Sequence, residues 1–387
     1  MPIDSTVGTT MLGLRLRQAR ELQGITQGHA AAQLNLARTT LVAIEAGKRP
    51  VSNPELRLFA EIYKVSESEL LNDDAPPIEL NVSFRSSAVG GRSTDEVLVA
   101  SMMKRLANST LQIESLLKQT PPKIDLPAVT VSRAGSLQRQ AEDEAIGLRS
   151  RLGIGIGPIQ NLPALLEFEI GIRVFERPLP SRVSGAVAYD ERAGAFLLLN
   201  SLHPLYRRRV TAGHELAHLL IRQQGVVVHF DGSPLEGREE RFCDLFGIAF
   251  LAPAAAVRRK AKELKDMFGG FSVKQLLMLA VFFGISIEAM SRRLEAIDML
   301  PAGTYEFLRS QGIGLAHRQA VADDMSVSEE GQPFTPRSLL LAELAFERDL
   351  LSEQQIASML EMNLVDVRKA IHDRDGSSEE VVLELAE

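Results

Sequence analysis

The sequence has little of several features that define classes of protein. It contains one cysteine, Cys243, which excludes a disulfide framework and any zinc site built from several thiolates. No stretch of about 18 consecutive apolar residues occurs, so we expect no transmembrane helix and no membrane partner. Residues 1–11 have neither a basic segment nor an apolar core, and a signal peptide is not expected. These absences predict a protein of the reducing cytoplasm.

Charge is distributed unevenly along the 387 residues, a length that predicts two or three domains. The net charge of −7 argues against non-specific coating of nucleic acid. Residues 11–49, however, carry six basic and two acidic side chains, whereas residues 321–387 carry five basic and sixteen acidic ones. The N-terminal end can therefore meet phosphate, and the C-terminal end would be repelled by it. The alternative is that both are solvated helix faces.

The first 72 residues contain signals for several short helices. Apolar residues recur at helical spacing over residues 12–22, and Gly24 ends this helix. Thr26 is positioned to cap a second helix. A third helix is expected over residues 37–46, and a fourth has Pro54 in its first turn. The pattern predicts a compact all-α unit.

This helix order resembles the helix-turn-helix domain of the phage-repressor-like (XRE) family of bacterial regulators. The resemblance rests on residues 16–20 (Leu-Arg-Gln-Ala-Arg), 24–27 (Gly-Ile-Thr-Gln) and 44–50 (Ile-Glu-Ala-Gly-Lys-Arg-Pro), and it covers residues 12–71. It implies contacts with the DNA backbone or with major-groove base edges. A helical bundle for protein contact or dimerisation is the alternative. The implied backbone contacts are Gln27, Lys48 and Arg49, and the implied base-edge contacts are Arg38, Thr39 and Thr40.

A linker with one long helix is expected next. Residues 72–77 (Asn-Asp-Asp-Ala-Pro-Pro) have turn chemistry, and residues 83–94 are rich in Ser and Gly. Residues 97–117 then have the apolar spacing of a single helix. This helix either packs on the rest of the chain or pairs with a second copy, so a homodimer is one of the expected assemblies.

The chemistry is concentrated around His214-Glu215-Leu216-Ala217-His218. The two histidines are four residues apart, so both imidazoles project from one helical face and can bind one zinc ion. Glu215 lies beside them and can act as general base toward a water at the zinc. This is the HExxH signature, although chance matches with structural histidines occur. Asn200 or Ser201 is positioned to cap this helix.

A second helix downstream offers a third ligand. Glu240 and Asp244 are four residues apart and share a face. Glu240 can complete a two-histidine, one-glutamate zinc site with an open position. Asp244 can orient a histidine through its other ring nitrogen. Glu239 is the competing ligand, and Cys243 is expected to be a small buried residue.

These segments resemble the ImmA/IrrE family of metallopeptidase domains over residues 141–300. The resemblance is carried by residues 199–200, 207–209, 214–218 and 240–253. It favours Glu240 over Glu239, because the spacing to Asp244 matches the family. Gly247 stands where the family usually has Ala. The resemblance implies a thermolysin-like zincin core with a small sheet, a Zn²⁺ cofactor, and a transcriptional repressor as substrate, cut after stress or DNA damage.

Smaller signals complete the prediction. Residues 186–199 predict a hairpin. Gly153, Gly155 and Gly157 are interpreted as a turn, because the full dinucleotide-binding spacing is absent. His203, His229 and Tyr206 are weighed as oxyanion donors against ordinary surface residues. Two more helices are expected near residues 351–371, with a packing or protein-binding role.

We therefore expect a mainly α fold with a small sheet (α+β). The expected domains are a helix-turn-helix domain (11–72), a linker (73–135), a zinc metallopeptidase domain (136–300) and an acidic helical region (301–387). The predicted function is a DNA-binding regulator fused to a zinc endopeptidase that cleaves a repressor. The alternative is a non-proteolytic regulator that uses the zincin fold as sensor or scaffold.

Overall fold

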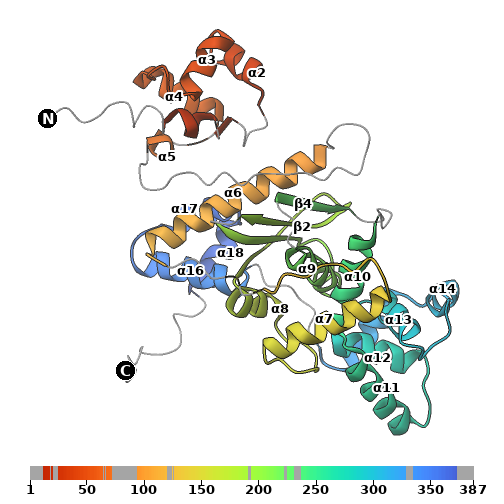
Figure 1. Cartoon of the computed structure of the whole chain (residues 1–387). Coiled ribbons are helices and arrows are strands. Elements are labelled where there is room, and N and C mark those ends of the chain that lie inside the picture. The colour runs from red at the N-terminus through yellow and green to blue at the C-terminus, as the bar shows by residue number, and fades with distance from the viewer. Residues whose placement is uncertain are drawn as a thin grey trace, which may run out of the picture. The chain divides into compact units, whose positions relative to one another are not determined.

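The computed structural model of the chain is mainly helical and has one small mixed sheet, as predicted (Figure 1). Its residues group into two compact units, one of residues 1–81, 90–120 and 343–368, the other of residues 82–89, 121–342 and 369–387. The structure describes residues 12–17, 19–20, 25–63, 65, 67–71, 94–119, 124, 126–190, 193–221, 225–230, 237–327 and 334–372. The predicted turn at residues 72–77 lies outside these ranges, and so does the Ser- and Gly-rich segment 83–94 except for Thr94.

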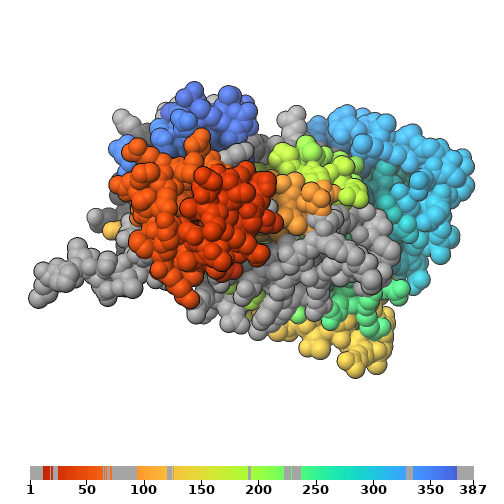
Figure 2. Space-filling view, turned by 90° about the horizontal axis from the view of Figure 1, so that it is seen from above, coloured from red at the N-terminus to blue at the C-terminus, as the bar shows by residue number. Residues whose placement is uncertain are grey.

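The N-terminal helices form a closely packed bundle (red and orange in Figure 2). Residues 12–17 and 19–20 are helical. Thr26 caps the next helix, since its hydroxyl accepts from the His29 amide, which confirms that prediction. The core is made of fully buried apolar side chains, among them Leu16, Leu41 and Phe59. The helices that follow are α2 (Gln27–Gln33), α3 (Arg38–Glu45), α4 (Asn53–Tyr63) and α5 (Glu67–Leu71).

The long linker helix belongs to the same unit as the last helices. It is α6 (Thr94–Leu116), and it packs against α17 (Glu353–Met359). Arg105 of α6 forms an ion pair with Glu361, just after α17. Ser352 and Gln355 form the capping box that opens α17. The helices flanking α17 are α16 (Pro336–Glu347) and α18 (Leu364–His372).

The sheet of the larger unit has the strand order β1-β3-β2-β4. Strand β1 pairs parallel with β3, and β2 runs antiparallel to both β3 and β4. The predicted hairpin is confirmed, with Val187 opposite Leu197 in the β2–β3 register. The strands are β1 (Ile172–Arg177), β2 (Val183–Asp190), β3 (Gly194–Asn200) and β4 (Gly225–Phe230).

Helix α9 (Leu205–Leu220) packs on strands β2 and β3, and α10 (Arg238–Leu251) packs on both α9 and α7 (Leu137–Arg151). This layering places α9 at the centre of the apolar core (Figure 1). The remaining elements are α8 (Leu162–Ala164), the π-helical turn η1 (Leu165–Ile170), α11 (Ala254–Phe268), α12 (Val273–Phe283), α13 (Ile287–Ala296), α14 (Thr304–Ser310) and α15 (Leu315–Asp324).

The expected cap of α9 is wrong. Pro204, and not Asn200 or Ser201, precedes the first turn, and it makes no side-chain cap. Asn200 is instead buried, and its amide nitrogen donates to the Val183 carbonyl at 2.8 Å while its oxygen accepts from the Leu202 amide at 3.1 Å. Asn200 therefore fixes the turn after β3, because a buried amide must find backbone partners.

Among the described residues, no single helix is long and apolar enough to cross a membrane. Helices α12 and α13 reach the required length and apolar composition only when they are counted together, and the pair is bent by 104° between the two helices.

Candidate metal centre

The two histidines of the HExxH segment lie one turn apart on α9 and face α10. Their Nε2 atoms are 2.9 Å apart. Oε2 of Glu240, in the first turn of α10, lies 3.6 Å from Nε2 of His214 and 3.5 Å from Nε2 of His218. These three side chains form a group that could hold a metal ion, with one ligand atom from each within 4.8 Å of the others.

The donor set and its spacing fit a zinc ion. In a tetrahedral site with zinc–ligand bonds of about 2.0–2.1 Å, ligand atoms stand roughly 3.3 Å apart. The three separations here are 2.9, 3.5 and 3.6 Å. Three protein ligands leave a fourth position open, which is the arrangement of catalytic rather than structural zinc sites.

Two further residues of the predicted site lie next to the ligands. Nδ1 of His214 lies 2.6 Å from Oδ1 of Asp244, so that carboxylate can orient the imidazole. Glu215, the predicted general base, follows His214 directly in α9 and is fully buried. Glu239, the competing ligand, is exposed and is not part of the metal-binding group.

Cys243 is buried, as expected, but it also touches the site. Its Sγ lies 3.7 Å from Nδ1 of His218. Burial, reinforced by the nearby carboxylates of Glu240 and Glu215, raises the pKa of the Cys243 thiol well above its usual range. A raised pKa disfavours the thiolate, which is the nucleophilic form of cysteine.

Two glycines allow the helices to approach closely enough to build this site. A side chain on Gly247 would place its Cβ 2.7 Å from the backbone nitrogen of His214. A side chain on Gly213 would place its Cβ 3.0 Å from the Gly247 Cα. Sequence reasoning treated Gly247 as a mild departure from the family. The sequence signal that could have identified Gly247 was its position, one helical turn after Cys243 and on the face of α10 that carries the ligand Glu240.

The three side chains weighed as oxyanion donors have other surroundings. His203 is buried, and its Nε2 lies 3.5 Å from the amide nitrogen of Asn200. The Tyr206 ring lies under the Arg318 guanidinium, 4.3 Å from its centroid. The side chain of His229 lies outside the described residues.

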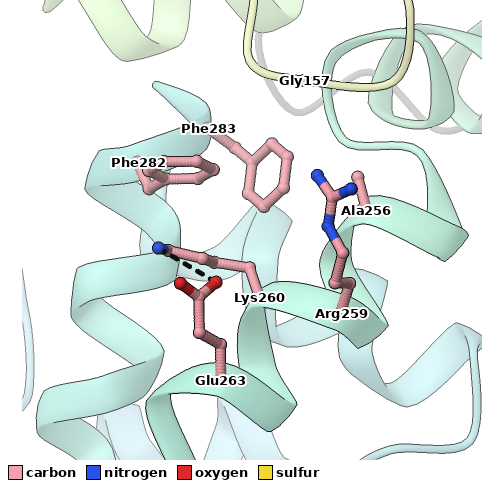
Figure 3. A pocket seen from close by; sticks show the side chains of 7 residues that line it. All are labelled: Gly157, Ala256, Arg259, Lys260, Glu263, Phe282 and Phe283. Atoms are coloured by element: carbon pink, nitrogen blue, oxygen red, sulfur yellow. Dashed lines mark ion pairs between the residues drawn. The ribbon is translucent and has the colours of Figure 1, made fainter. Parts of the chain in front are cut away.

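A separate hollow of about 480 Å³ lies beside α11 and α12 (Figure 3). Within it, Lys260 pairs with Glu263 at 3.2 Å and lies 4.9 Å from the centroid of the Phe282 ring. Its lining shares no residue with the metal-binding group. The lining residues are Gly157, Ala256, Arg259, Lys260, Glu263, Phe282 and Phe283.

The glycine-rich segment beside this hollow is a turn, as expected. Gly153 and Gly155 have positive φ angles of 66° and 61°. The carbonyl of Gly155 accepts from Nε of the buried Arg149 at 2.7 Å, and the carbonyl of Gly157 accepts from the same guanidinium. These carbonyls hold an internal arginine, so the loop has a structural role in the packing of α7.

The predicted DNA-contacting residues differ in their exposure and in whether their side chains already have a partner within the protein. Arg38 and Thr39 are exposed in the first turn of α3, Thr40 is half-buried there, and Lys48 is exposed after its end. Neither Arg38 nor Lys48 forms an ion pair with any residue that the structure describes. These two cations are available to a polyanion.

Two other predicted contacts are already engaged. The Gln27 amide donates to Glu45 at 2.9 Å, and Glu45 accepts two hydrogen bonds from the buried Arg20. Arg49 pairs with Glu55 at 2.8 Å. Arg20, Gln27 and Glu45 belong to the segments that resemble the XRE family. Their hydrogen bonds therefore link three helices of the bundle.

These observations define a protein that carries a helix-turn-helix unit and, elsewhere in the chain, a group of two histidines and one glutamate that could hold a metal ion. Residues 169–295 match the model of the IrrE N-terminal-like domain, Peptidase_M78. Residues 11–72 match a helix-turn-helix domain model. The chain therefore carries an IrrE N-terminal-like domain of a peptidase family behind an N-terminal DNA-binding helix-turn-helix domain.

A curated relative is the HTH-type transcriptional regulator PrpR of Mycobacterium tuberculosis. The two are 27% identical over 151 residues, which is 39% of this chain and 28% of the relative. The chain thus matches less than a third of that protein's length.

Proposed function

We propose that this protein is a DNA-binding transcriptional regulator whose IrrE-like domain is a zinc-dependent endopeptidase. The observation that carries the proposal is the convergence of His214, His218 and Glu240 with the buried Glu215 beside them. Glu215 is fully buried in the helix that carries both histidines, and it stands at the position of the general base in the HExxH signature.

Each residue of the site has a separate role in the proposed peptide hydrolysis. A bound zinc ion would polarise the scissile carbonyl and make water acidic. His214, His218 and Glu240 would hold it. Glu215 takes the proton from the attacking water and passes it to the leaving amine. Asp244 fixes the ring of His214, so that its Nε2 keeps its lone pair toward the site.

We infer that the substrate is a transcriptional repressor, cut in response to stress or DNA damage. The support is the DNA-binding domain on the same chain together with the family resemblance of the peptidase domain. Tethering to DNA would raise the local concentration of the peptidase near a DNA-bound repressor. DNA and a DNA-bound repressor are both found in the cytoplasm, where we place the protein. Val97 and Leu98 of α6, 39% and 48% exposed, could contact a second copy of the chain.

A regulator without proteolysis is the second candidate, with the metal centre as sensor or scaffold. It is favoured by the name of the relative, a transcriptional regulator. The two candidates differ at Glu215, since only proteolysis needs a general base.

The test uses a repressor encoded next to this protein's gene as candidate substrate. The purified chain, with stoichiometric zinc verified by elemental analysis, is incubated with the repressor, and products are identified by mass spectrometry. Wild type and the Glu239→Gln control should cut the repressor, and Glu215→Gln should retain zinc but show no cleavage. Cleavage by Glu215→Gln at the wild-type rate would refute the proposed mechanism. Zinc binding with no cleavage by any form would favour the sensor.

A further inference from the structure

Helix α3 of the N-terminal bundle has one face that takes no part in the bundle core. Leu41 and Ile44 are fully buried in that core, whereas Val42 is 42% exposed and lies outside it. Arg38, also exposed, precedes Val42 by four residues, so the two side chains lie on one side of the helix, about one turn apart. The exposed surface of α3 therefore carries an apolar side chain next to a cation.

This face belongs to the second helix of a helix-turn-helix unit. Residues 11–72 match that domain, and α2 packs against α3 within it. In such units the second helix lies in the major groove of DNA, and residues of its N-terminal part contact base edges. The exposed side chains of α3 are therefore the ones that would face the bases.

The side chains of α3 restrict which bases it can recognise. Adenine is typically read by Asn or Gln, and cytosine by Asp or Glu. Helix α3 has no Asn, Gln or Asp, and its one acidic residue, Glu45, is buried and accepts from Arg20 and Gln27. Arg38 remains for guanine, and exposed methyl groups remain for the 5-methyl group of thymine. Val42 carries two such methyl groups.

We propose that Val42 is a specificity-determining residue that contacts the 5-methyl group of a thymine in the major groove, beside a guanine that Arg38 reads. The inference rests on the proposed DNA binding and is independent of the metal centre. Four residues of helix rise about 6 Å, and stacked base pairs are about 3.4 Å apart, so the thymine should lie about two base pairs from the guanine. Thr39, exposed on the same helix, adds a hydroxyl that discriminates little, because it both donates and accepts.

The first experiment defines the DNA site with the full chain. Duplexes that the wild type retains from a random-sequence library are sequenced, and the enriched motif should contain a guanine and a thymine about two base pairs apart. Val42→Ala should retain the guanine and lose the preference for thymine. Leu58→Ala, which removes an apolar side chain of α4 that is 38% exposed, is the matched control and should select the wild-type motif.

The second experiment removes only the methyl group that Val42 is inferred to contact. In the selected duplex the thymine is replaced by uracil, which keeps every hydrogen-bonding group of the base. Wild type and Leu58→Ala should bind the uracil duplex about fourfold more weakly, the effect of leaving one methyl-sized apolar group unburied. Val42→Ala should bind the two duplexes equally. Fluorescence anisotropy at one fixed salt concentration measures the affinities, since phosphate contacts make them salt-dependent.

The outcomes separate the role of Val42 from DNA binding itself. A Val42→Ala chain that still prefers thymine over uracil, or a wild type indifferent to the methyl group, would overturn that role. Uracil at a thymine on the far side of the motif should change nothing, and an equal loss there would assign the effect to duplex shape and also overturn the contact. A wild type that retains no duplex from the library would refute the proposed DNA binding.

Discussion

Gly213 of α9 and Gly247 of α10 lie against each other with no room for a side chain between them. A Cβ on Gly247 would stand 2.7 Å from the His214 nitrogen and 2.8 Å from the Gly213 carbonyl carbon. The backbones of the two helices are therefore in direct contact at the turn that carries the first histidine. This contact sets the distance across which Glu240 reaches the imidazoles.

We predict that Gly247→Ala forces α10 away from α9 and weakens both the fold and the metal site. Overpacking of this kind costs about 1–3 kcal/mol, and zinc affinity should fall because Glu240 moves with the helix. Denaturant unfolding and chelator competition measure the two effects. Gly147→Ala is the matched control, since that helical glycine has open space around it, and it should stabilise α7 by about 0.5–1 kcal/mol. Equal behaviour of the two variants would contradict the prediction.

Replacement of the third ligand should remove the metal. Glu240→Gln deletes a charged ligand, so the loss of zinc affinity should exceed the roughly 100-fold limit typical of outer partners. Glu239→Gln, one residue earlier and exposed, should leave affinity unchanged. Isothermal titration with zinc distinguishes them, and a larger loss in Glu239→Gln would show that the wrong glutamate has been assigned.

DNA binding should depend most on Arg38 and Lys48, which form no ion pair with any residue that the structure describes. Lys48→Ala should weaken binding to all sequences and lower the slope of log affinity against log salt by about 1. Arg38→Ala should also relax sequence preference, because it lies at the start of α3. Fluorescence anisotropy at several salt concentrations measures both. Arg57→Ala, whose side chain pairs with Glu67 on the bundle surface, is the control and should change neither.

A buried carboxylate makes the stability of the larger unit depend on pH near neutrality. Glu167 of η1 is 2% exposed and accepts from the Thr335 hydroxyl at 2.6 Å and from the Arg337 amide at 2.8 Å. Burial raises its pKa to about 7, despite these hydrogen bonds. The folded state therefore binds more protons than the unfolded state between the ordinary glutamate pKa and pH 7.

The stabilisation linked to this proton is fully present below the ordinary glutamate pKa, falls as pH rises toward 7, and is lost once pH has passed the folded-state pKa of about 7. The steepest fall is about 1.4 kcal/mol per pH unit for one proton. Glu167→Gln should remove this component, so the difference in unfolding free energy between wild type and variant should change across pH 5–8. Glu169→Gln, exposed on the same turn, should differ from wild type by a constant amount. A difference independent of pH for Glu167→Gln would contradict the prediction.

Local features of this protein could be predicted from the sequence, because they depend on neighbours along the chain. The four-residue spacing of His214 and His218 places both rings on one face of any helix. Thr26 and the Ser352–Gln355 pair cap their helices through backbone groups three residues away. The alternation that predicts the β2–β3 hairpin has a two-residue period and is equally local.

Other features depend on which segments meet in three dimensions. The sequence favours Glu240 over Glu239 only through the family resemblance, because the direction in which α10 faces α9 depends on helix packing. Asn200 was assigned to a cap, because the sequence does not show that backbone carbonyls of a distant loop surround it. The contact of Cys243 with His218 and the closeness of Gly213 and Gly247 arise from helix packing. Their sequence separations, 25 and 34 residues, carry no pattern that the chain alone could reveal.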